Sequence, residues 1–138
     1  MINYNNYNEQ NNMKTILIDA WNTFITPEGV NREIQKILEE FSNKKIILTS
    51  ANEEEKIQYG IMNMPYEVFS LKHQPNKDDP EYYKKMLKHF NLVAKETIYF
   101  EHNPNAAEAA RSVGINTFWY NKDQPNLDSL KTSLLDNL

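Results

Sequence analysis

Three polar side chains stand at the ends of short apolar runs in this sequence. Asp19 follows residues 15–18, Thr49 ends the run 45–49, and Glu101 follows residues 97–100. Short runs that are rich in β-branched side chains and lack helical spacing are typical of buried strands in a parallel sheet. Open α/β sheets carry their reactive groups at the carboxyl ends of such strands. Asp19 therefore stands where a catalytic carboxylate is expected.

Strand-like and helix-like segments alternate along the chain. Val30, Ile34 and Leu38 recur at helical spacing after a loop that contains Pro27 and Gly29. Strands are expected at 15–18, 45–49, 66–71, 97–100 and 116–120, and helices at about 30–41, 53–59, 80–90, 104–113 and 127–134. This alternation predicts the α/β class, with a parallel sheet of about five strands and right-handed crossover helices on both faces.

Capping residues mark the ends of several expected helices. Asn52 can accept hydrogen bonds from the first turn of a short helix, and Gly60 can end it. Asp79 and Pro80 occupy N-cap and first-turn positions of the next helix. Gly114 is placed to end the alanine-rich helix. These signals agree with the boundaries that the periodicity predicts.

Composition narrows the class of protein. A length of 138 residues fits one domain, which we assign to residues 13–138. Residues 1–12 are rich in Asn without aliphatic periodicity, so a flexible tail is expected there. The net charge of −4 comes without a basic stripe, so no nucleic-acid partner is expected. The chain has no cysteine and no apolar run approaching about 20 residues, which predicts a cytoplasmic protein without a membrane partner.

Four segments, taken in order, resemble the motifs of the haloacid dehalogenase-like (HAD) hydrolases. Asp19-x-x-x-Thr23 resembles the nucleophile motif, and KKIILTS places Thr49 like the family's phosphate-binding Thr or Ser. KDDPEYY, which opens with Lys77, is similar to the family's lysine segment. IYFEHNPNAAEAARSVGI contains Glu101 and resembles the acidic segment with its following helix. The resemblance implies a three-layer, Rossmann-like fold, and the short gaps between motifs leave no room for a cap domain.

The same resemblance implies roles for individual residues. Asp19 would attack phosphorus and form an aspartyl intermediate, because a carboxylate nucleophile can split a difficult displacement into two easier ones. Lys77 would neutralise Asp19 and the phosphate, and Thr49 would hold a phosphoryl oxygen. Further contacts to the substrate and its loop are expected from Thr23, Ser50 and Asn52.

Two positions depart from the family motifs. Trp21 stands where the phosphatase members carry a second Asp, a general acid and base of the kind that typically contributes about 10²- to 10⁴-fold in rate. His102 stands where the family has a second acidic residue, a magnesium ligand. Imidazole suits softer metals, whereas Mg²⁺ demands oxygen ligands. Asp19 and Glu101 remain as anionic ligands, so the sequence predicts a weak Mg²⁺ site at most.

Three functions fit these motifs. The first is a divergent HAD-like hydrolase whose phosphatase-type site is weak or inactive, with a phosphorylated small molecule or macromolecule as its partner. The second is a non-catalytic binding module that uses the same pocket. The third, 2-haloacid dehalogenation, is favoured by Asp19-Ala20-Trp21-Asn22-Thr23 but disfavoured by Ala106, which lies where an acidic residue is expected. Members of the family without a cap can close their sites by oligomerisation, so an oligomer also fits.

Overall fold

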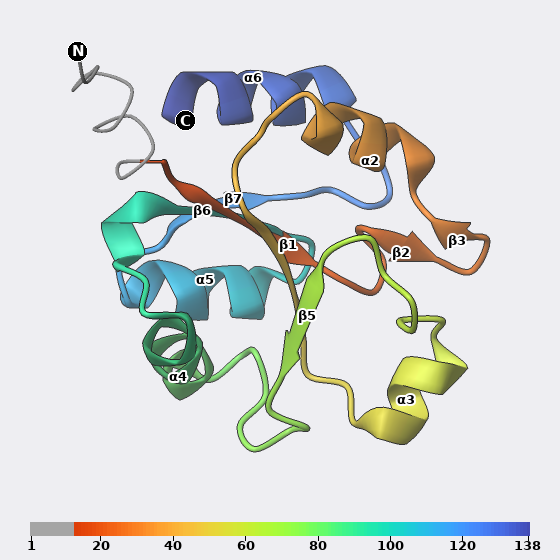
Figure 1. Ribbon diagram of the computed structural model, residues 1–138, viewed down its shortest axis with the longest axis vertical. Helices are drawn as coiled ribbons and strands as arrows, with labels where there is room; N and C mark the ends of the chain where they lie inside the picture. Colours follow the sequence, from red (N-terminus) through yellow and green to blue (C-terminus); the bar gives the residue numbers. More distant parts are fainter. Residues whose placement is uncertain (1–12) are drawn as a thin grey trace, which may run out of the picture.

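A parallel sheet of five strands forms the centre of the molecule (Figure 1). The computed structural model describes residues 13–138, so the flexible tail expected at 1–12 lies outside the described residues. The strands follow the order β5-β4-β1-β6-β7. Their bounds are Thr15–Asp19 for β1, Lys45–Thr49 for β4, Glu67–Ser70 for β5, Thr97–Glu101 for β6 and Asn116–Trp119 for β7. The predicted α/β class with its parallel sheet is confirmed.

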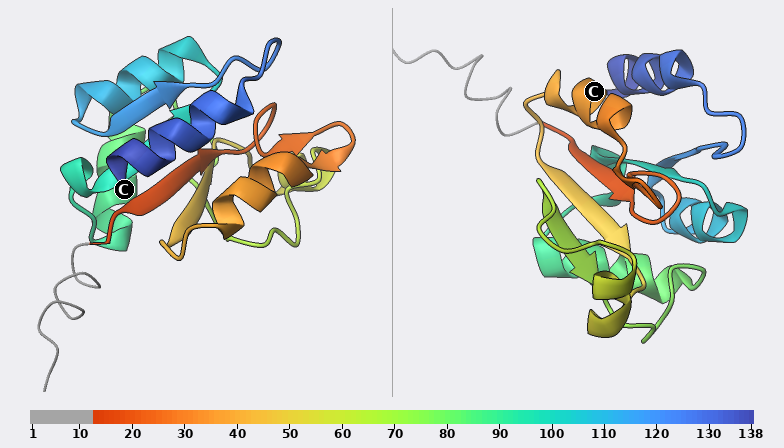
Figure 2. Two further views of the ribbon diagram at one scale, coloured as in Figure 1. Left: turned by 90° about the horizontal axis from the view of Figure 1, so that it is seen from above. Right: turned by 90° about the vertical axis from the view of Figure 1, so that its right-hand side faces the viewer.

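Helices cover both faces of the sheet and give the molecule three layers (Figure 2). α2 (Arg32–Glu39) and α6 (Leu127–Asn137) lie on one face, and α4 (Pro80–Phe90) and α5 (Pro104–Ser112) lie on the other. α3 (Glu53–Gln58) buries none of its residues. Each of these helices overlaps one that the sequence predicts. No helix in residues 13–138 is long and apolar enough to cross a membrane.

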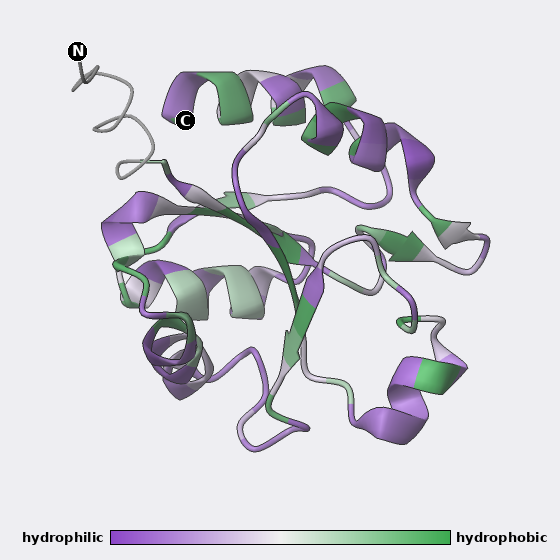
Figure 3. Ribbon diagram, viewed as in Figure 1, coloured by the Kyte–Doolittle hydropathy of each residue, from purple (hydrophilic) through white to green (hydrophobic). Residues whose placement is uncertain are grey.

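The central strand β1 is buried along its whole length. Its side chains alternate between the faces: Ile16 and Ile18 pack on the side of α2 and α6, whereas Leu17 packs on the side of α4 and α5. A strand that is covered on both faces needs apolar side chains at successive positions, which explains why its sequence shows no alternation. In Figure 3 the hydrophobic colours follow the sheet, whereas α3 is largely hydrophilic.

The segment between β1 and α2 holds a small hairpin that the sequence did not predict. β2 (Ile25–Thr26) and β3 (Gly29–Val30) pair antiparallel where a loop was expected. Strands of two residues are too short to show periodicity, so the pattern indicated only the turn residues. Gly29 has a φ of 106°, a backbone conformation that side chains rarely adopt. A 3₁₀ turn at Ala94–Glu96 was also missed, because an element of three residues is too short to show periodicity.

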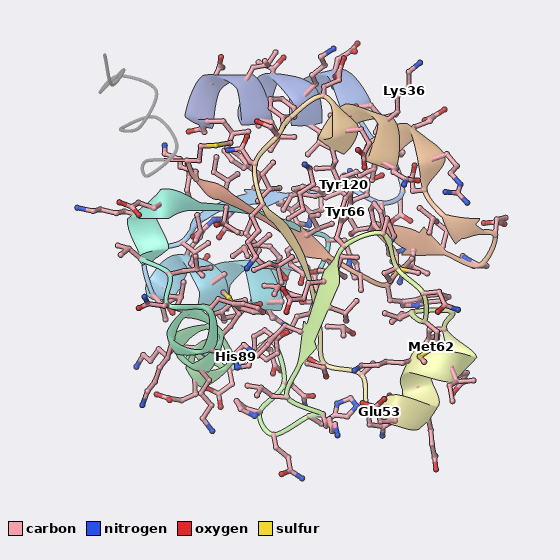
Figure 4. All side chains as sticks on the ribbon, viewed as in Figure 1. Lys36, Glu53, Met62, Tyr66, His89 and Tyr120 are labelled. Carbon is pink, nitrogen blue, oxygen red and sulfur yellow. The ribbon has the colours of Figure 1, made fainter. Side chains whose placement is uncertain are left out.

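Two tyrosines contribute to the largely aliphatic core on the side of α2 and α6. Tyr66 and Tyr120 pack against the core on that side, whereas Lys36 points outward from α2 (Figure 4). Tyr120, directly after β7, is 7% exposed, but its neighbour Trp119 is 53% exposed. Core packing therefore accounts for Tyr120 but not for Trp119. The Trp119 indole instead donates a hydrogen bond to the carbonyl of His102 at 2.8 Å.

The order of the strands reverses between β1 and β6. From β1 the chain adds β4 and β5 on one side, and it then adds β6 and β7 on the other. Open α/β sheets bind their ligands outside the carboxyl ends of the strands at such a reversal. Asp19 ends β1 and Glu101 ends β6, so the topology brings the two carboxylates to the same place.

Candidate active site

Asp19 lies in the lining of a pocket at the carboxyl ends of the central strands. The pocket has a volume of about 340 Å³, and Asp19 is 1% exposed. The walls come from α3, from the loop after β5 and from the start of α5. The lining includes Trp21, Thr49, Ser50, Tyr59, Lys77, Glu101 and His102. The structure thus gathers side chains from five separate segments around one carboxylate.

Both carboxylate oxygens of Asp19 accept hydrogen bonds. Lys77 Nζ lies 2.5 Å from Oδ1. The hydroxyl of Thr23 donates to Oδ2 at 2.7 Å, and the backbone N–H of His102 donates to the same oxygen at 3.2 Å. Nδ1 of the His102 ring also contacts Oδ2. Asp19 is therefore fixed by three segments of the chain, one of them its own loop.

Lys77 reaches Asp19 from the loop between β5 and α4. Its backbone N–H donates to the hydroxyl of Ser50 at 2.9 Å, which ties the loop to the end of β4. Its ammonium group lies 2.5 Å from Asp19 and 2.6 Å from Glu101, and its side chain is 13% exposed. One buried cation therefore bridges two buried carboxylates.

Glu101 is held in the same way by its neighbours on β6 and in the loop that follows. The hydroxyl of Tyr99 donates to Oε1 at 2.6 Å, and the backbone N–H of Asn103 donates to Oε2 at 3.0 Å. Nδ1 of His102 lies 3.2 Å from Oε2. The sequence did not single out Tyr99, because a tyrosine inside an apolar strand has the pattern of a core residue.

Trp21 forms part of the pocket wall. Its ring lies 4.6 Å from the ring of Tyr59, centroid to centroid, and the two planes are tilted by 46°. Tyr59 immediately follows α3, so the contact joins the loop after β1 to that helix. Trp21 is half-buried, and the pocket remains hollow beside it.

The remaining predicted residues lie nearby but differ in what their side chains do. Thr49 and Ser50 line the pocket, and the Thr49 hydroxyl accepts a hydrogen bond from the N–H of Ala51 at 3.1 Å. The side chain of Asn52 accepts from the N–H of Glu55 at 2.9 Å, as expected of a helix cap. Asn52 does not appear in the pocket lining. Its predicted substrate contact remains a prediction.

A family model identifies the chain. The model that describes haloacid dehalogenase-like hydrolases matches residues 1–120. The chain belongs to this family. A search of curated proteins gives no match. The resemblance drawn from the four sequence segments is thereby confirmed, and the chain is a HAD-like hydrolase domain.

Solved structures share the HAD fold. A HAD family enzyme from Bacteroides thetaiotaomicron, an aspartate-to-alanine variant with magnesium and inorganic phosphate, has a TM-score of 0.61 at 13% identity, over 86% of this chain and 98% of that one. The core domain of a provisionally named phosphoglycolate phosphatase from Streptococcus pneumoniae has a TM-score of 0.60 at 14% identity, over 91% of this chain and 97% of that one. A provisionally named β-phosphoglucomutase from Thermotoga maritima is 25% identical and has a TM-score of 0.51, over 64% of this chain and 44% of that one.

The charged groups in this HAD pocket shift one another's pKa values. Burial opposes the charge on Lys77, but Asp19 and Glu101 beside it raise the pKa of its ammonium group. Burial also opposes ionisation of Glu101, yet Lys77 lowers its pKa well below the usual range. Burial raises the pKa of Asp19, and Lys77 opposes that rise. Burial lowers the pKa of His102, but its hydrogen bonds to Asp19 and Glu101 dominate and raise it to about 9.

One cluster in the pocket wall was not predicted from the sequence. Nδ1 of His73 lies 2.5 Å from the side-chain oxygen of Asn76, and its Nε2 contacts Glu55 on α3. Hydrogen bonds to Glu55 and Asn76 raise the pKa of His73. The three side chains join the loop after β5 to α3 across the pocket. His73 and Asn76 share one loop, but Glu55 lies 18 residues before His73 and the three match no motif, so only the fold brings Glu55 to the other two.

Asp19, Glu101 and His102 form a group with the composition of a metal site. One ligand atom from each lies within 4.8 Å of the others. The group offers two carboxylates and one imidazole nitrogen. A HAD family enzyme of the same fold binds magnesium and phosphate.

Proposed function

We propose that this HAD domain hydrolyses phosphorylated compounds slowly, with Asp19 as the nucleophile. The position of Trp21 carries the proposal. Because its ring packs on Tyr59 in the wall, about 340 Å³ stays open beside the carboxylate. Ligand pockets are typically about 300–1,000 Å³. A tryptophan that filled this space would have left no room for a phosphoryl group.

The proposed reaction has two steps. An oxygen of Asp19 forms a bond to phosphorus, the bond from phosphorus to the leaving oxygen breaks, and the leaving group departs with the electron pair. Water then attacks the phosphorus of the aspartyl phosphate, which releases inorganic phosphate, restores the carboxylate and passes a proton to solvent. Lys77, which contacts Asp19 at 2.5 Å, is placed to receive a phosphoryl oxygen, as are the pocket-lining Thr49 and Ser50.

Lys77 also addresses the charge problem of this reaction. A carboxylate that meets an anionic oxygen at about 4 Å is repelled by about 4 kcal/mol per charge pair at an effective dielectric constant of 20. The Lys77 ammonium lies between Asp19 and Glu101 inside the pocket lining. Its charge offsets part of that repulsion when the phosphoryl group enters.

Trp21 sets the class of substrate. An indole cannot protonate a departing alkoxide, and the loss of a general acid costs about 10²- to 10⁴-fold in rate, or about 3 to 5 kcal/mol of barrier. Leaving groups that are stable as anions do not need that proton. The substrate class that suits the pocket is therefore an acyl or aryl phosphate rather than a simple alkyl phosphate.

The missing base affects the second step as well. No carboxylate stands at position 21 to take a proton from the attacking water. Hydrolysis of the aspartyl phosphate is therefore expected to be slower than its formation from an acyl phosphate. The enzyme should release one leaving group rapidly and then turn over slowly, which is the kinetic pattern of an accumulating covalent intermediate.

A non-catalytic binding module is the second candidate, and the hydrogen bonds of Asp19 favour it. Donors that stabilise a carboxylate also lower its nucleophilicity, and both oxygens of Asp19 accept hydrogen bonds from Lys77, Thr23 or His102. In that case the pocket would bind a phosphorylated ligand without chemistry. Dehalogenation has less support, because the described pocket lining holds no arginine for a substrate carboxylate.

Three proteins separate these candidates in an assay with an aryl phosphate: the wild type, Asp19→Asn, and the double variant Trp21→Asp with His102→Asp. Circular dichroism first establishes that each variant is folded. We expect slow turnover by the wild type and a loss of about 10²-fold or more in Asp19→Asn, because the attacking group is gone. Turnover confined to the double variant would identify a dormant phosphatase. No turnover in any of the three would favour the binding module.

A further inference from the structure

The carboxylates of Asp19 and Glu101 accept hydrogen bonds from other groups of the protein. Each of the four carboxylate oxygens of Asp19 and Glu101 accepts at least one hydrogen bond within the chain. The donors are Lys77 for Asp19 Oδ1 and Glu101 Oε1, Thr23 and His102 for Asp19 Oδ2, Tyr99 for Glu101 Oε1, and Asn103 for Glu101 Oε2. These donors fix the orientation of both carboxylate groups.

The His102 ring lies against both carboxylates. Its Nδ1 contacts Oδ2 of Asp19 and lies 3.2 Å from Oε2 of Glu101. The ring nitrogen therefore bridges the two carboxylates on one side, as the Lys77 ammonium bridges them on the other. Nδ1 can donate in this geometry in two forms of the ring: the neutral tautomer that carries its proton on Nδ1, and the charged imidazolium.

Magnesium does not suit this arrangement. Mg²⁺ demands a near-octahedral shell of oxygen atoms at about 2.0–2.1 Å and loses its water reluctantly. The group Asp19, Glu101 and His102 offers an imidazole nitrogen where an oxygen is required, and that nitrogen already contacts both carboxylates. An ion between the two carboxylates would have to displace the His102 ring from its contacts with Asp19 and Glu101. The residues present do not fit Mg²⁺.

We propose that Lys77 and His102 together take the place of the divalent cation, so that this pocket binds a phosphoryl group without magnesium. The proposal rests on the proposed function in one respect, because it takes the pocket to be a phosphoryl site. Lys77 fixes one oxygen of each carboxylate, and His102 fixes the other. A phosphoryl oxygen then meets N–H groups of the protein where a metal-dependent site presents an ion.

Calorimetric titration of protein freed of metal with EDTA tests the proposal. MgCl₂ alone is titrated first, and inorganic phosphate is then titrated with and without MgCl₂. We expect no saturable heat from Mg²⁺. We also expect magnesium to change the phosphate affinity by less than about twofold, whereas coupled sites typically give about 5- to 150-fold.

Variants at two histidines sharpen the test. His102→Asp supplies the missing oxygen ligand and removes the imidazole, so it should gain saturable Mg²⁺ binding and bind phosphate more tightly when Mg²⁺ is present. His73→Asp is the matched control, because His73 is also a histidine in the pocket lining that contacts a carboxylate, Glu55. It should gain no Mg²⁺ binding. His102→Asn serves if the aspartate variant fails to fold, and its phosphate affinity should fall without rescue by Mg²⁺.

The outcomes separate this inference from the proposed function. Saturable Mg²⁺ binding by the wild type, lost in Glu101→Gln, overturns the inference and leaves Asp19 as nucleophile intact. Phosphate binding that requires Mg²⁺ has the same consequence. Absence of phosphate binding with and without metal overturns the inference and counts against a phosphoryl site altogether.

Discussion

Lys77 lies between two buried carboxylates, and its charge balances theirs. Removing one partner from a buried, hydrogen-bonded charge cluster typically costs about 3–5 kcal/mol, because the remaining charges lose their compensation. Lys77→Met keeps the length of the side chain and removes the ammonium group. We expect it to lower the free energy of unfolding by about that amount, measured by urea denaturation.

Lys84 provides the control for this prediction. It forms a salt bridge of 3.3 Å with Glu81 on the surface of α4, and both side chains are more than half exposed. Exposed pairs contribute about 0–1 kcal/mol. Lys84→Met should therefore leave the free energy of unfolding nearly unchanged. A loss in Lys77→Met no larger than the loss in Lys84→Met would show that the buried cluster does not depend on the ammonium group.

The sequence predicted the charged residues of the site better than their supports. Asp19 and Glu101 each stand at the end of an apolar strand, so the local pattern marked both as candidates. Lys77 was found because it opens KDDPEYY, a segment similar to a motif of the family. Tyr99 and Tyr59 were missed because an aromatic side chain in a strand or after a helix is usually a packing residue. The direction of the Trp21 ring is decided by Tyr59, a contact between residues that lie far apart in the sequence.

At the scale of elements, α3 depends on its cap. The helix buries none of its residues, and its first turn is closed by Asn52, which accepts from Glu55 at 2.9 Å while Glu55 accepts from Asn52 at 3.0 Å. Tyr59 directly after the helix supports Trp21, and Glu55 contacts His73. The cap therefore holds one wall of the pocket in place.

Asn52→Ala is expected to cost about 1 kcal/mol of stability, the usual price of losing such a cap. It should also increase hydrogen exchange in α3 and weaken the binding of inorganic phosphate, because the wall becomes mobile. Asn126→Ala is the matched control. Asn126 caps α6 by accepting from Ser129 at 2.9 Å, but α6 contributes nothing to the pocket lining. Equal phosphate affinities in the two variants would contradict the role assigned to α3.

Elements were predictable where periodicity had room to develop. The helix α4 is long enough to show helical spacing, and Asp79 with Pro80 marked its start. The strand β1 was recognised by a run of apolar, β-branched residues rather than by alternation. The β2–β3 hairpin was missed because each of its strands has two residues. Its position is set by backbone hydrogen bonds such as Ile25 to the carbonyl of Ala20 at 2.9 Å, which no side-chain pattern reveals.

For the whole molecule, the sequence indicated a parallel sheet that is covered on both faces, and the structure confirms it. The order of the strands did not follow from the pattern, because a parallel crossover can place the next strand on either side of the preceding one. That order puts β1 beside β6 and so brings Asp19 to Glu101. Between β1 and β4 the chain forms only the short β2–β3 hairpin and α2.

A pocket in which Lys77 and His102 contact the carboxylates should react with an acyl phosphate without added metal. Acetyl phosphate needs no general acid, and position 21 offers no base for the second step. The aspartyl phosphate should therefore accumulate on the intact protein. Intact-protein mass spectrometry can detect it in samples that are quenched with acid.

The central claim is that Asp19 accepts a phosphoryl group without magnesium. The measurement is the mass of the whole chain after incubation with acetyl phosphate in EDTA, for the wild type and for Asp19→Asn. We predict a wild-type species heavier by one phosphoryl group, with the modification in the peptide that contains Asp19, and no such species in Asp19→Asn. The same adduct in both proteins, or an adduct that forms in the wild type only when Mg²⁺ replaces EDTA, would contradict the claim.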